Sequence, residues 1–210
     1  MNGAAFAFVK RIFDLVLAIV ALSLLWPVLL IVAILVKRSS PGPVFYRGLR
    51  TGRFGTPFYI WKFRSMVVDG ERVGGTTTAE NDPRITRVGL VIRKYKLDEL
   101  PQLFNVLTGE MSFVGPRPEV AEYTDSYSPD EQRILNVKPG ITDWASLEFN
   151  DLQSHVGRED ADRAFRERVL PRKNQLRLRY VDQQSLWFDF YILVQTFLVV
   201  ASKPFRRSRT

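Results

Sequence analysis

One apolar stretch near the N-terminus dominates the hydrophobic pattern of the chain. From Ile12 to Val36, only Asp14, Ser23 and Pro27 interrupt the apolar residues. A stretch of this length is typical of a helix inserted in a membrane. A cleaved signal peptide would need a small-residue cleavage site after its apolar core, whereas two basic residues follow this stretch directly. The pattern therefore predicts a membrane helix that is retained.

The flanks of this stretch indicate how it meets the membrane. Lys10 and Arg11 precede it, and Lys37 and Arg38 follow it. Basic flanks favour the cytoplasmic side, and a simple span would leave one pair outside. Pro27 predicts a break, and the helix before it would rise only about 22 Å, less than the roughly 30 Å hydrocarbon core. We therefore expect a re-entrant helix that enters and leaves by the same face; the alternative is a single span with a proline kink.

A second apolar stretch, Leu186 to Ala201, lies near the C-terminus. It is short and carries Asp189, Gln195 and Thr196, so it is too polar to span a membrane comfortably. Its aromatic residues suit the headgroup boundary, which favours an interfacial helix. A buried amphipathic helix is an equally good interpretation.

The segment between these stretches shows short strand and helix patterns. Aromatic and β-branched runs separated by glycine and proline predict a small hairpin, and the helical patterns include an exposed, arginine-rich region interrupted at Pro171. The strand runs are Val44–Tyr46 and Phe58–Phe63, and the helical runs are Val88–Lys94, Asp98–Leu107 and Glu159–Tyr180. The predicted fold is α+β and predominantly helical, with an N-terminal re-entrant membrane helix, a small β-hairpin and a C-terminal interfacial helix. We divide it into a membrane anchor (1–38), a cytoplasmic catalytic domain (39–185) and an interfacial helix with a basic tail (186–210).

Composition restricts the chemistry that the chain can perform. The 210 residues carry a net charge of +8, which points to phosphate, acidic lipid or nucleic acid as a partner. With no cysteine, neither a disulfide nor a thiolate metal site can form. The one histidine, His155, argues against a zinc or histidine-base mechanism. Catalysis would have to use carboxylates, cations and a bound metal.

An acidic pair with cations just before it is the first candidate site. Asp98 and Glu99 stand at a predicted helix start, after Arg93, Lys94 and Lys96. Acidic residues in a first turn usually only cap the helix and interact favourably with its dipole. The dipole also lowers the pKa of a carboxylate, which favours binding of a hard cation such as Mg²⁺. Capping and catalysis are therefore compatible.

Two cationic motifs could bind phosphate. Arg117 lies in the rigid loop Gly115–Pro118, and a guanidinium binds phosphate oxygens through two N–H groups. Proline-bracketed arginines are also common in surface turns. Lys62 and Arg64 alternate with aromatic residues, a pattern that is also typical of a half-exposed strand.

Four blocks together resemble a known family, the bacterial sugar transferases or monotopic phosphoglycosyl transferases. These blocks are Trp61–Met66, Asn81–Gly89, Leu97–Asn105 and Gly115–Pro118, and with the apolar N-terminal stretch they cover nearly the whole chain. The combination of the last two blocks at this spacing is highly specific.

The resemblance implies a reaction and a set of site residues. Asp98 is similar to the family's nucleophile and Glu99 to its Mg²⁺-associated partner, while Lys62, Arg93 and Arg117 match positions that contact phosphate or nucleotide groups. A sugar 1-phosphate would pass from a UDP-sugar to polyprenyl phosphate through a phosphosugar-aspartate intermediate, with release of UMP. This would be the first membrane step of glycoconjugate assembly.

The resemblance also implies a location. Pro27 matches the family's helix-breaking proline, although Trp26 stands where the family often has serine; Ser23, one turn earlier, can supply the hydroxyl. The expected location is the cytoplasmic face of the bacterial inner membrane, and the expected partners are a nucleotide sugar, polyprenyl phosphate and the bilayer. The sequence leaves open which sugar is used and whether the chain forms a homo-oligomer.

Two other functions were weighed against this one. A basic membrane-surface adapter without catalysis would share the amphipathic helices but would not need an acidic pair beside cations. A nucleic-acid-binding protein is favoured only by charge, since no recognition motif is present, so we expect no nucleic-acid partner. Two loops, Gly70–Pro83 and Gly140–Asp151, are candidate regions for sugar specificity because of their positions near the motifs.

Overall fold

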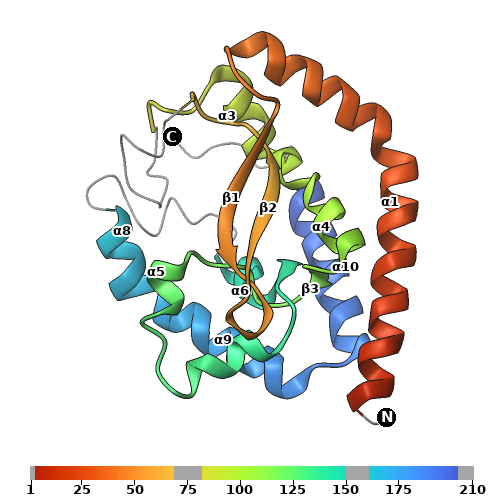
Figure 1. Ribbon diagram of the computed structural model, residues 1–210, viewed down its shortest axis with the longest axis vertical. Coiled ribbons are helices and arrows are strands. Elements are labelled where there is room, and N and C mark those ends of the chain that lie inside the picture. The colour runs from red at the N-terminus through yellow and green to blue at the C-terminus, as the bar shows by residue number, and fades with distance from the viewer. Residues whose placement is uncertain (1–2, 69–81, 150–160, 203–210) are drawn as a thin grey trace.

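A long helix, a hairpin and a group of shorter helices form the part of the chain that the computed structural model describes, residues 3–68, 82–149 and 161–202 (Figure 1). This agrees with the predicted, mainly helical α+β fold. The helices are α1 (Gly3–Ser39), η1 (Arg53–Gly55), α3 (Arg87–Lys94), η2 (Leu97–Glu99), α4 (Gln102–Thr108), α5 (Ala121–Thr124), η3 (Glu131–Asn136), α6 (Trp144–Glu148), α8 (Ala161–Ala164), η4 (Phe165–Val169), α9 (Leu170–Gln183) and α10 (Leu186–Ser202). The strands are β1 (Phe45–Thr51), β2 (Pro57–Phe63), β3 (Ser112–Val114) and β4 (Gly140–Thr142). His155 and most of the Gly70–Pro83 loop lie outside the described residues.

Helix α1 is long and apolar enough to cross a membrane. Its most apolar 18-residue window has a mean hydropathy of 3.0, and only 11% of that window is buried within the protein. Helical structure continues through Pro27, and the helix bends in its C-terminal part instead of dividing into two helices (Figure 1). A proline removes one backbone hydrogen bond and so produces such a bend. The re-entrant course stays a prediction.

Helix α1 packs on the rest of the protein at its two ends. Lys10, Asp14 and Ala18 form a buried stripe with a four-residue spacing, which places them on one helical face. Val32 and Val36 are buried near the other end, whereas no residue from 19 to 31 is buried. The middle of α1 therefore exposes apolar side chains that a bilayer could cover.

The predicted hairpin is present, with a longer first strand than the sequence pattern indicated. Strands β1 and β2 pair antiparallel, with Phe45 opposite Phe63 and Thr51 opposite Pro57. Phe58 and Ile60 pack with Ala18 of α1 and with α4 and β3, while Phe63 packs with Val32, Val36 and Ile92. The hairpin thus contacts α1 through two apolar clusters, and α4 packs against both α1 and β2.

The predicted helix from Asp98 to Leu107 is divided in two. Asp98 and Glu99 lie in the separate 3₁₀ turn η2, and α4 begins at Gln102 after Pro101. Gly109 ends α4 with a φ of 87°, as the predicted glycine stop requires. The prediction that the acidic pair opens the long helix was therefore wrong, because Asp98 and Glu99 belong to a separate, tighter turn that Leu100 and Pro101 join to α4.

The C-terminal half contains a feature that the sequence pattern did not predict and one that it misjudged. Strands β3 and β4 pair in parallel over three residues each, which is too short for a recognisable pattern. The arginine-rich region was expected to be exposed, but α9 buries Lys173, Arg177 and Tyr180, and Pro171 stands in its first turn. Helix α10 buries Asp189 and Ile192 and exposes aromatic residues such as Trp187 and Phe197. Its interfacial location stays a prediction.

Candidate active site

The acidic pair is held in a constrained turn. Lys96, directly before η2, has a φ of 59°, a left-handed conformation that is unfavourable for a residue with a side chain. Such conformations concentrate at functional sites, where the surrounding structure offsets their cost. The turn buries Asp98, whose exposed fraction is 6%, and aims Glu99 towards two cations.

Glu99 forms ion pairs with two of the predicted site residues. Its Oε1 lies 3.0 Å from Lys62 Nζ and 2.5 Å from Arg117 Nη2. Burial opposes ionisation of Glu99, but the charges of Arg117 and Lys62 outweigh burial and hold its pKa well below its usual value. Glu99 is therefore an ionised carboxylate, and three predicted site residues meet at one oxygen atom.

Asp98 has the opposite environment, although it is the adjacent residue. Its Oδ1 is buried and has no hydrogen-bond partner among the described residues. Burial raises the pKa of Asp98, and the nearby negative charge of Glu99 raises it further, against the opposing charge of Lys62. The expectation that a helix dipole lowers both pKa values was thus wrong for Asp98. The negative charge of Glu99 is thus balanced by two ion pairs, whereas Asp98 retains an oxygen without a hydrogen-bond partner among the described residues.

Arg93 and Arg117 approach this pair from different elements. Arg93, in the last turn of α3, contacts Ser65 Oγ at 3.4 Å and lies close enough for its charge to act on Asp98. Arg117 donates to Glu99 through Nη2 and to the carbonyl oxygen of Ile141 through Nη1. These two bonds use two of the five N–H donors of the guanidinium, so others remain for a substrate oxygen.

The loop that carries Arg117 is fixed by a close approach of two backbones. A Cβ atom on Gly115 would lie 2.3 Å from the carbonyl oxygen of Lys138, and one on Gly140 would lie 2.2 Å from the backbone nitrogen of Gly115. Only glycine fits at both positions. The backbone N–H of Arg117 also donates to Asp143 Oδ2 at 3.1 Å. Arg117 is therefore positioned from its backbone as well as from its side chain.

A second group of charged residues, which we call the Arg177 cluster, lies beyond Arg117 and was missed by the sequence reasoning. Arg177, with a fully buried side chain, donates through Nη2 to Glu119 Oε1 at 2.7 Å and through Nε to Asp143 Oδ2 at 3.3 Å. Lys173 Nζ lies 3.8 Å from Glu119 Oε1. Burial opposes ionisation of Glu119 and Asp143, but Arg177 and Lys173 outweigh it and lower both pKa values. The Arg177 cluster consists of Glu119, Asp143, Lys173 and Arg177.

The acidic pair fits Mg²⁺ as part of a site that a substrate would complete. In the described ranges, no group of three or more His, Cys, Asp or Glu side chains could hold a metal ion. However, Mg²⁺ is commonly bound by one or two carboxylates together with substrate phosphates. Asp98 Oδ1 is unpartnered, and both cations that contact Glu99 do so at Oε1. The donors therefore suit a magnesium ion that is bound together with a diphosphate.

Two arginines connect α1 to the elements of the site. Arg11 donates to the carbonyl oxygens of Val106 and Leu107, at 2.6 and 2.8 Å, and so caps the C-terminal end of α4. Arg64, directly after β2, donates to carbonyl oxygens at the end of α1, including that of Ser40 at 2.7 Å. The sequence pattern left Arg64 as a half-exposed strand residue, but it is buried and caps a helix.

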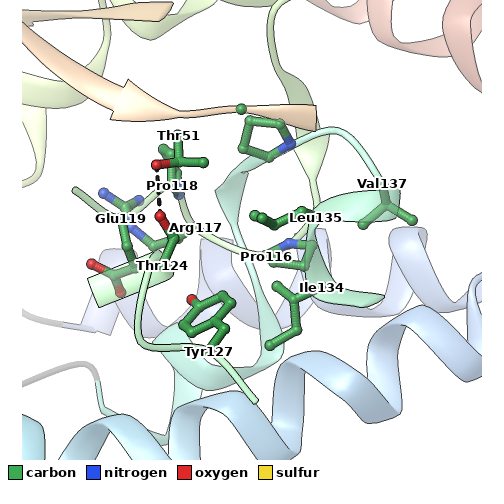
Figure 2. Close-up of a pocket in the computed structure, with 12 residues that line it drawn as sticks. Thr51, Pro116, Arg117, Pro118, Glu119, Thr124, Tyr127, Ile134, Leu135 and Val137 are labelled. Carbon is green, nitrogen blue, oxygen red and sulfur yellow. Dashed lines mark hydrogen bonds between the residues drawn. The ribbon is translucent and has the colours of Figure 1, made fainter. Parts of the chain in front are cut away.

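A hollow beside the hairpin turn is distinct from the acidic pair. Figure 2 shows its lining, which includes Pro116, Tyr127 and Leu135, and the hydrogen bond of 2.9 Å between the hydroxyl groups of Thr51 and Thr124. The lining contains Arg117 but neither carboxylate of the pair. The candidate active site is therefore the Asp98–Glu99 turn and not this hollow.

An apolar helix suited to a membrane, joined to a domain that sets an acidic pair among cations, is typical of membrane-associated enzymes that act on phosphorylated substrates. Sequence comparison specifies the class. The profile of the family described as Bacterial sugar transferase matches residues 5–203. The chain therefore belongs to the bacterial sugar transferase family.

Several characterised relatives share the sequence of this domain. The chain is 43% identical over 201 residues to the UDP-glucose:undecaprenyl-phosphate glucose-1-phosphate transferase of Xanthomonas campestris pv. campestris, which covers 91% of this chain and 38% of the relative. It is 42% identical to the enzyme of the same name from Escherichia coli (strain K12), over 89% of this chain and 39% of the relative. It is 39% identical to the UDP-N-acetylgalactosamine-undecaprenyl-phosphate N-acetylgalactosaminephosphotransferase of Aeromonas hydrophila, over 91% of this chain and 43% of the relative. The chain thus spans about two fifths of the length of these relatives.

Proposed function

We propose that the chain transfers a sugar 1-phosphate from a UDP-sugar to polyprenyl phosphate at the cytoplasmic face of the bacterial inner membrane. The names of the relatives above support this reaction type, and they differ in the sugar. The proposal therefore specifies a UDP-sugar without choosing the hexose. The products are polyprenyl-diphosphate-sugar and UMP.

The division of labour within the acidic pair is the observation that carries this proposal. Glu99 is held by Lys62 and Arg117, whereas Asp98 has an unpartnered Oδ1 in the same turn. A nucleophile needs a free oxygen close to cations that stabilise the attacked phosphoryl group. Asp98 meets this requirement, whereas Glu99 is already engaged in two ion pairs.

The chemistry proceeds in two displacements at the same phosphorus atom. The carboxylate of Asp98 attacks the β-phosphorus of the UDP-sugar, the bond from that phosphorus to the bridging oxygen breaks, and UMP leaves with this oxygen. A phosphate oxygen of polyprenyl phosphate then attacks the same phosphorus and displaces the Asp98 carboxylate. Lys62, Arg93 and Arg117 orient the phosphates and offset their charge.

Mg²⁺ would be held by Asp98 and Glu99 and, when bound, would offset negative charge on the diphosphate. The raised pKa of Asp98 favours the protonated form of its carboxyl group when no substrate is bound. Cations that arrive with the substrate favour the ionised form that attacks. Substrate binding and activation of Asp98 are therefore coupled through charge.

The membrane arrangement serves the lipid substrate. We propose that α1 is re-entrant, with both ends on the cytoplasmic side, and that α10 lies in the interface through exposed aromatic residues such as Trp187. The polyprenyl phosphate headgroup would then meet the site in the plane of the membrane. Single cysteines at Gly3 and Phe205 should both be protected from an impermeant label in intact spheroplasts. Labelling of just one of them would establish a span.

The test of the reaction is a trapped intermediate. The purified chain is incubated with Mg²⁺ and UDP-glucose, UDP-galactose or UDP-N-acetylgalactosamine labelled at the β-phosphate, without lipid acceptor. We expect a burst of UMP equal to the amount of enzyme and a labelled Leu97–Phe104 peptide, both abolished by Asp98→Asn. Glu99→Gln should mainly slow the Mg²⁺-dependent rate, and Asp125→Asn, an exposed acid, is the matched control.

Two results would contradict the proposal. If UMP forms only with polyprenyl phosphate present and no label is trapped, the lipid attacks directly in a ternary complex and Asp98 acts as a base or metal ligand. If no UDP-sugar yields UMP under either condition, while the chain still binds membranes, a non-catalytic surface adapter is the better interpretation.

A further inference from the structure

Two buried side-chain amides lie one helical turn apart in α4 and differ in their hydrogen bonding. Asn105 is fully buried and satisfied, because Nδ2 donates to the Tyr59 carbonyl and to Glu110 Oε2, both at 2.8 Å, and Oδ1 accepts from the Trp61 backbone at 2.9 Å. Gln102 is also fully buried, but neither Nε2 nor Oε1 has a hydrogen-bond partner among the described residues. The two amides therefore serve different purposes.

An unsatisfied buried amide is costly and uncommon. Roughly nine in ten buried polar groups in proteins have a partner, and a donor or acceptor left without one costs about 1–3 kcal/mol. A methionine of similar shape at this position would avoid that cost. The fold therefore gains nothing from the amide of Gln102, which points to a partner that binds during the reaction.

The position of Gln102 identifies the region where that partner binds. Gln102 follows Glu99 by three residues and Asp98 by four, and Leu100 and Pro101 between them have helical dihedral angles. The backbone bonds here run from each residue to the third one before it, as from Leu100 to Leu97 and from Leu103 to Leu100, so Gln102 lies one turn after Glu99. Asp98 Oδ1 is also buried, with no hydrogen-bond partner among the described residues. The turn that carries the nucleophile and the turn that follows it thus each contain an unsatisfied buried group.

We propose that Gln102 is a further catalytic residue, whose Nε2–H donates to a non-bridging oxygen of the phosphoryl group as that group is transferred to and from Asp98. This inference rests on the function proposed above. Asp98 is itself only 6% exposed and Gln102 is fully buried four residues later, so a phosphoryl group that bonds to Asp98 enters the buried region next to this turn. A neutral amide donor at that point stabilises the charge that spreads over the phosphoryl oxygens in the transition state.

The amide also complements the cations of the site. Lys62 and Arg117 already contact Glu99, so their charge acts partly on that carboxylate. Gln102 has no competing partner in the described parts of the chain, so its donor is available in full to the phosphoryl oxygen. Its Oε1 can accept from a hydroxyl group of the sugar or from a water molecule carried in with the diphosphate.

The test replaces the amide with an apolar side chain of the same length. For Gln102→Met we expect the rate constant of the UMP burst to fall about 100-fold, as for loss of one preorganised donor, with the KM for UDP-sugar changed less than about threefold. The thermal unfolding midpoint should stay the same or rise, because two unsatisfied groups are removed. The trapped label on Asp98 should form slowly but completely.

Asn105→Leu is the matched control. It removes three hydrogen bonds and should lower the unfolding midpoint by about 5 °C or more while leaving the burst rate within about threefold of wild type. The inference is wrong if Gln102→Met keeps the wild-type burst rate, or if it changes only KM. A wild-type chain that releases no UMP would instead contradict the proposed function, so the two failures are distinguishable.

Discussion

The Asp98–Glu99 turn and the Arg177 cluster lie on either side of Arg117, and they use buried charge differently. In the Arg177 cluster, both carboxylates contact Arg177, and their pKa values are lowered. In the turn, Glu99 is paired in the same way, but Asp98 has an unpartnered oxygen and a raised pKa. The same residue types thus form one cluster in which both carboxylates are paired with cations, which we call saturated, and one in which Asp98 has an unpartnered oxygen, which we call unsaturated.

This difference indicates where structure and chemistry are separated. A saturated buried cluster fixes the positions of the backbones that it joins, and removing one member leaves a buried charge unpaired. An unsaturated cluster retains electrostatic energy that a substrate can use. Arg117 connects the two, since its backbone contacts Asp143 and its side chain contacts Glu99. Substitutions in the first cluster should therefore affect stability, and those in the second should affect rate.

The largest effect is expected for Arg177→Met. The substitution leaves Asp143 and Glu119 buried without their main counter-charge and should lower the free energy of unfolding by roughly 3–5 kcal/mol. The measurement is the thermal unfolding midpoint in detergent, followed by tryptophan fluorescence. Arg172→Met on the same helix is the control, because its ion pair with Glu148 is exposed and should contribute little to stability. Equal midpoints for the two variants would show that the cluster is not a stabilising unit.

A smaller effect is expected from the titration of Lys173. Burial lowers its pKa from 10.5 to about 8, against the opposing charge of Glu119. Between these pH values the unfolded chain binds more protons than the folded one, so stability rises with pH. From pH 7 to 10.5 the free energy of unfolding of the wild type should rise relative to that of Lys173→Met by roughly 3 kcal/mol. If the free energy of unfolding of the two proteins changes with pH in the same way, the pKa of Lys173 is not lowered by burial.

The smallest effect is expected for Arg117→Lys. An ammonium group cannot contact Glu99 and the Ile141 carbonyl with the planar geometry of a guanidinium, so kcat/KM should fall about 10- to 100-fold. The unfolding midpoint should fall by no more than about 4 °C, because the positive charge is kept and only the hydrogen bond to the Ile141 carbonyl is lost. Arg133→Lys, at an exposed ion pair, is the control. A wild-type value of kcat/KM would show that Arg117 only shapes the loop and does not contribute to catalysis.

The sequence predicted those parts of the site that lie in compact motifs. Glu99 and Arg117 stood out from local patterns and Lys62 from the family resemblance, and the fold brings the three to one oxygen atom. The lowered pKa of Glu99 could not be predicted, because it depends on contacts with residues 37 and 18 positions away. The raised pKa of Asp98 depends first on its burial, which the tertiary structure sets. The left-handed conformation of Lys96 also has no signature in the sequence.

The Arg177 cluster was missed because its members lie outside the motifs, although Glu119 directly follows the last of them. One signal was available in α9. Lys173 and Arg177 follow Leu170 by three and seven residues, which places both cations on the apolar face of the helix. A cation at such a position must be paired when buried. The arginine count suggested an exposed helix instead, and composition alone cannot distinguish the two cases.

The two ends of α1 have a mechanical consequence. Arg11 holds the end of α4, the helix that follows the acidic pair, and Arg64 joins the other end of α1 to β2, the strand that carries Lys62. Between Ala18 and Val32 no residue is fully buried, and in the proposed membrane arrangement lipid contacts most of this segment. A change in bilayer thickness would then load both supports at once and alter the distance between Lys62 and Glu99. Bilayer thickness would thereby act on the geometry of the active site, and the turnover rate should depend on the acyl-chain length of the lipids.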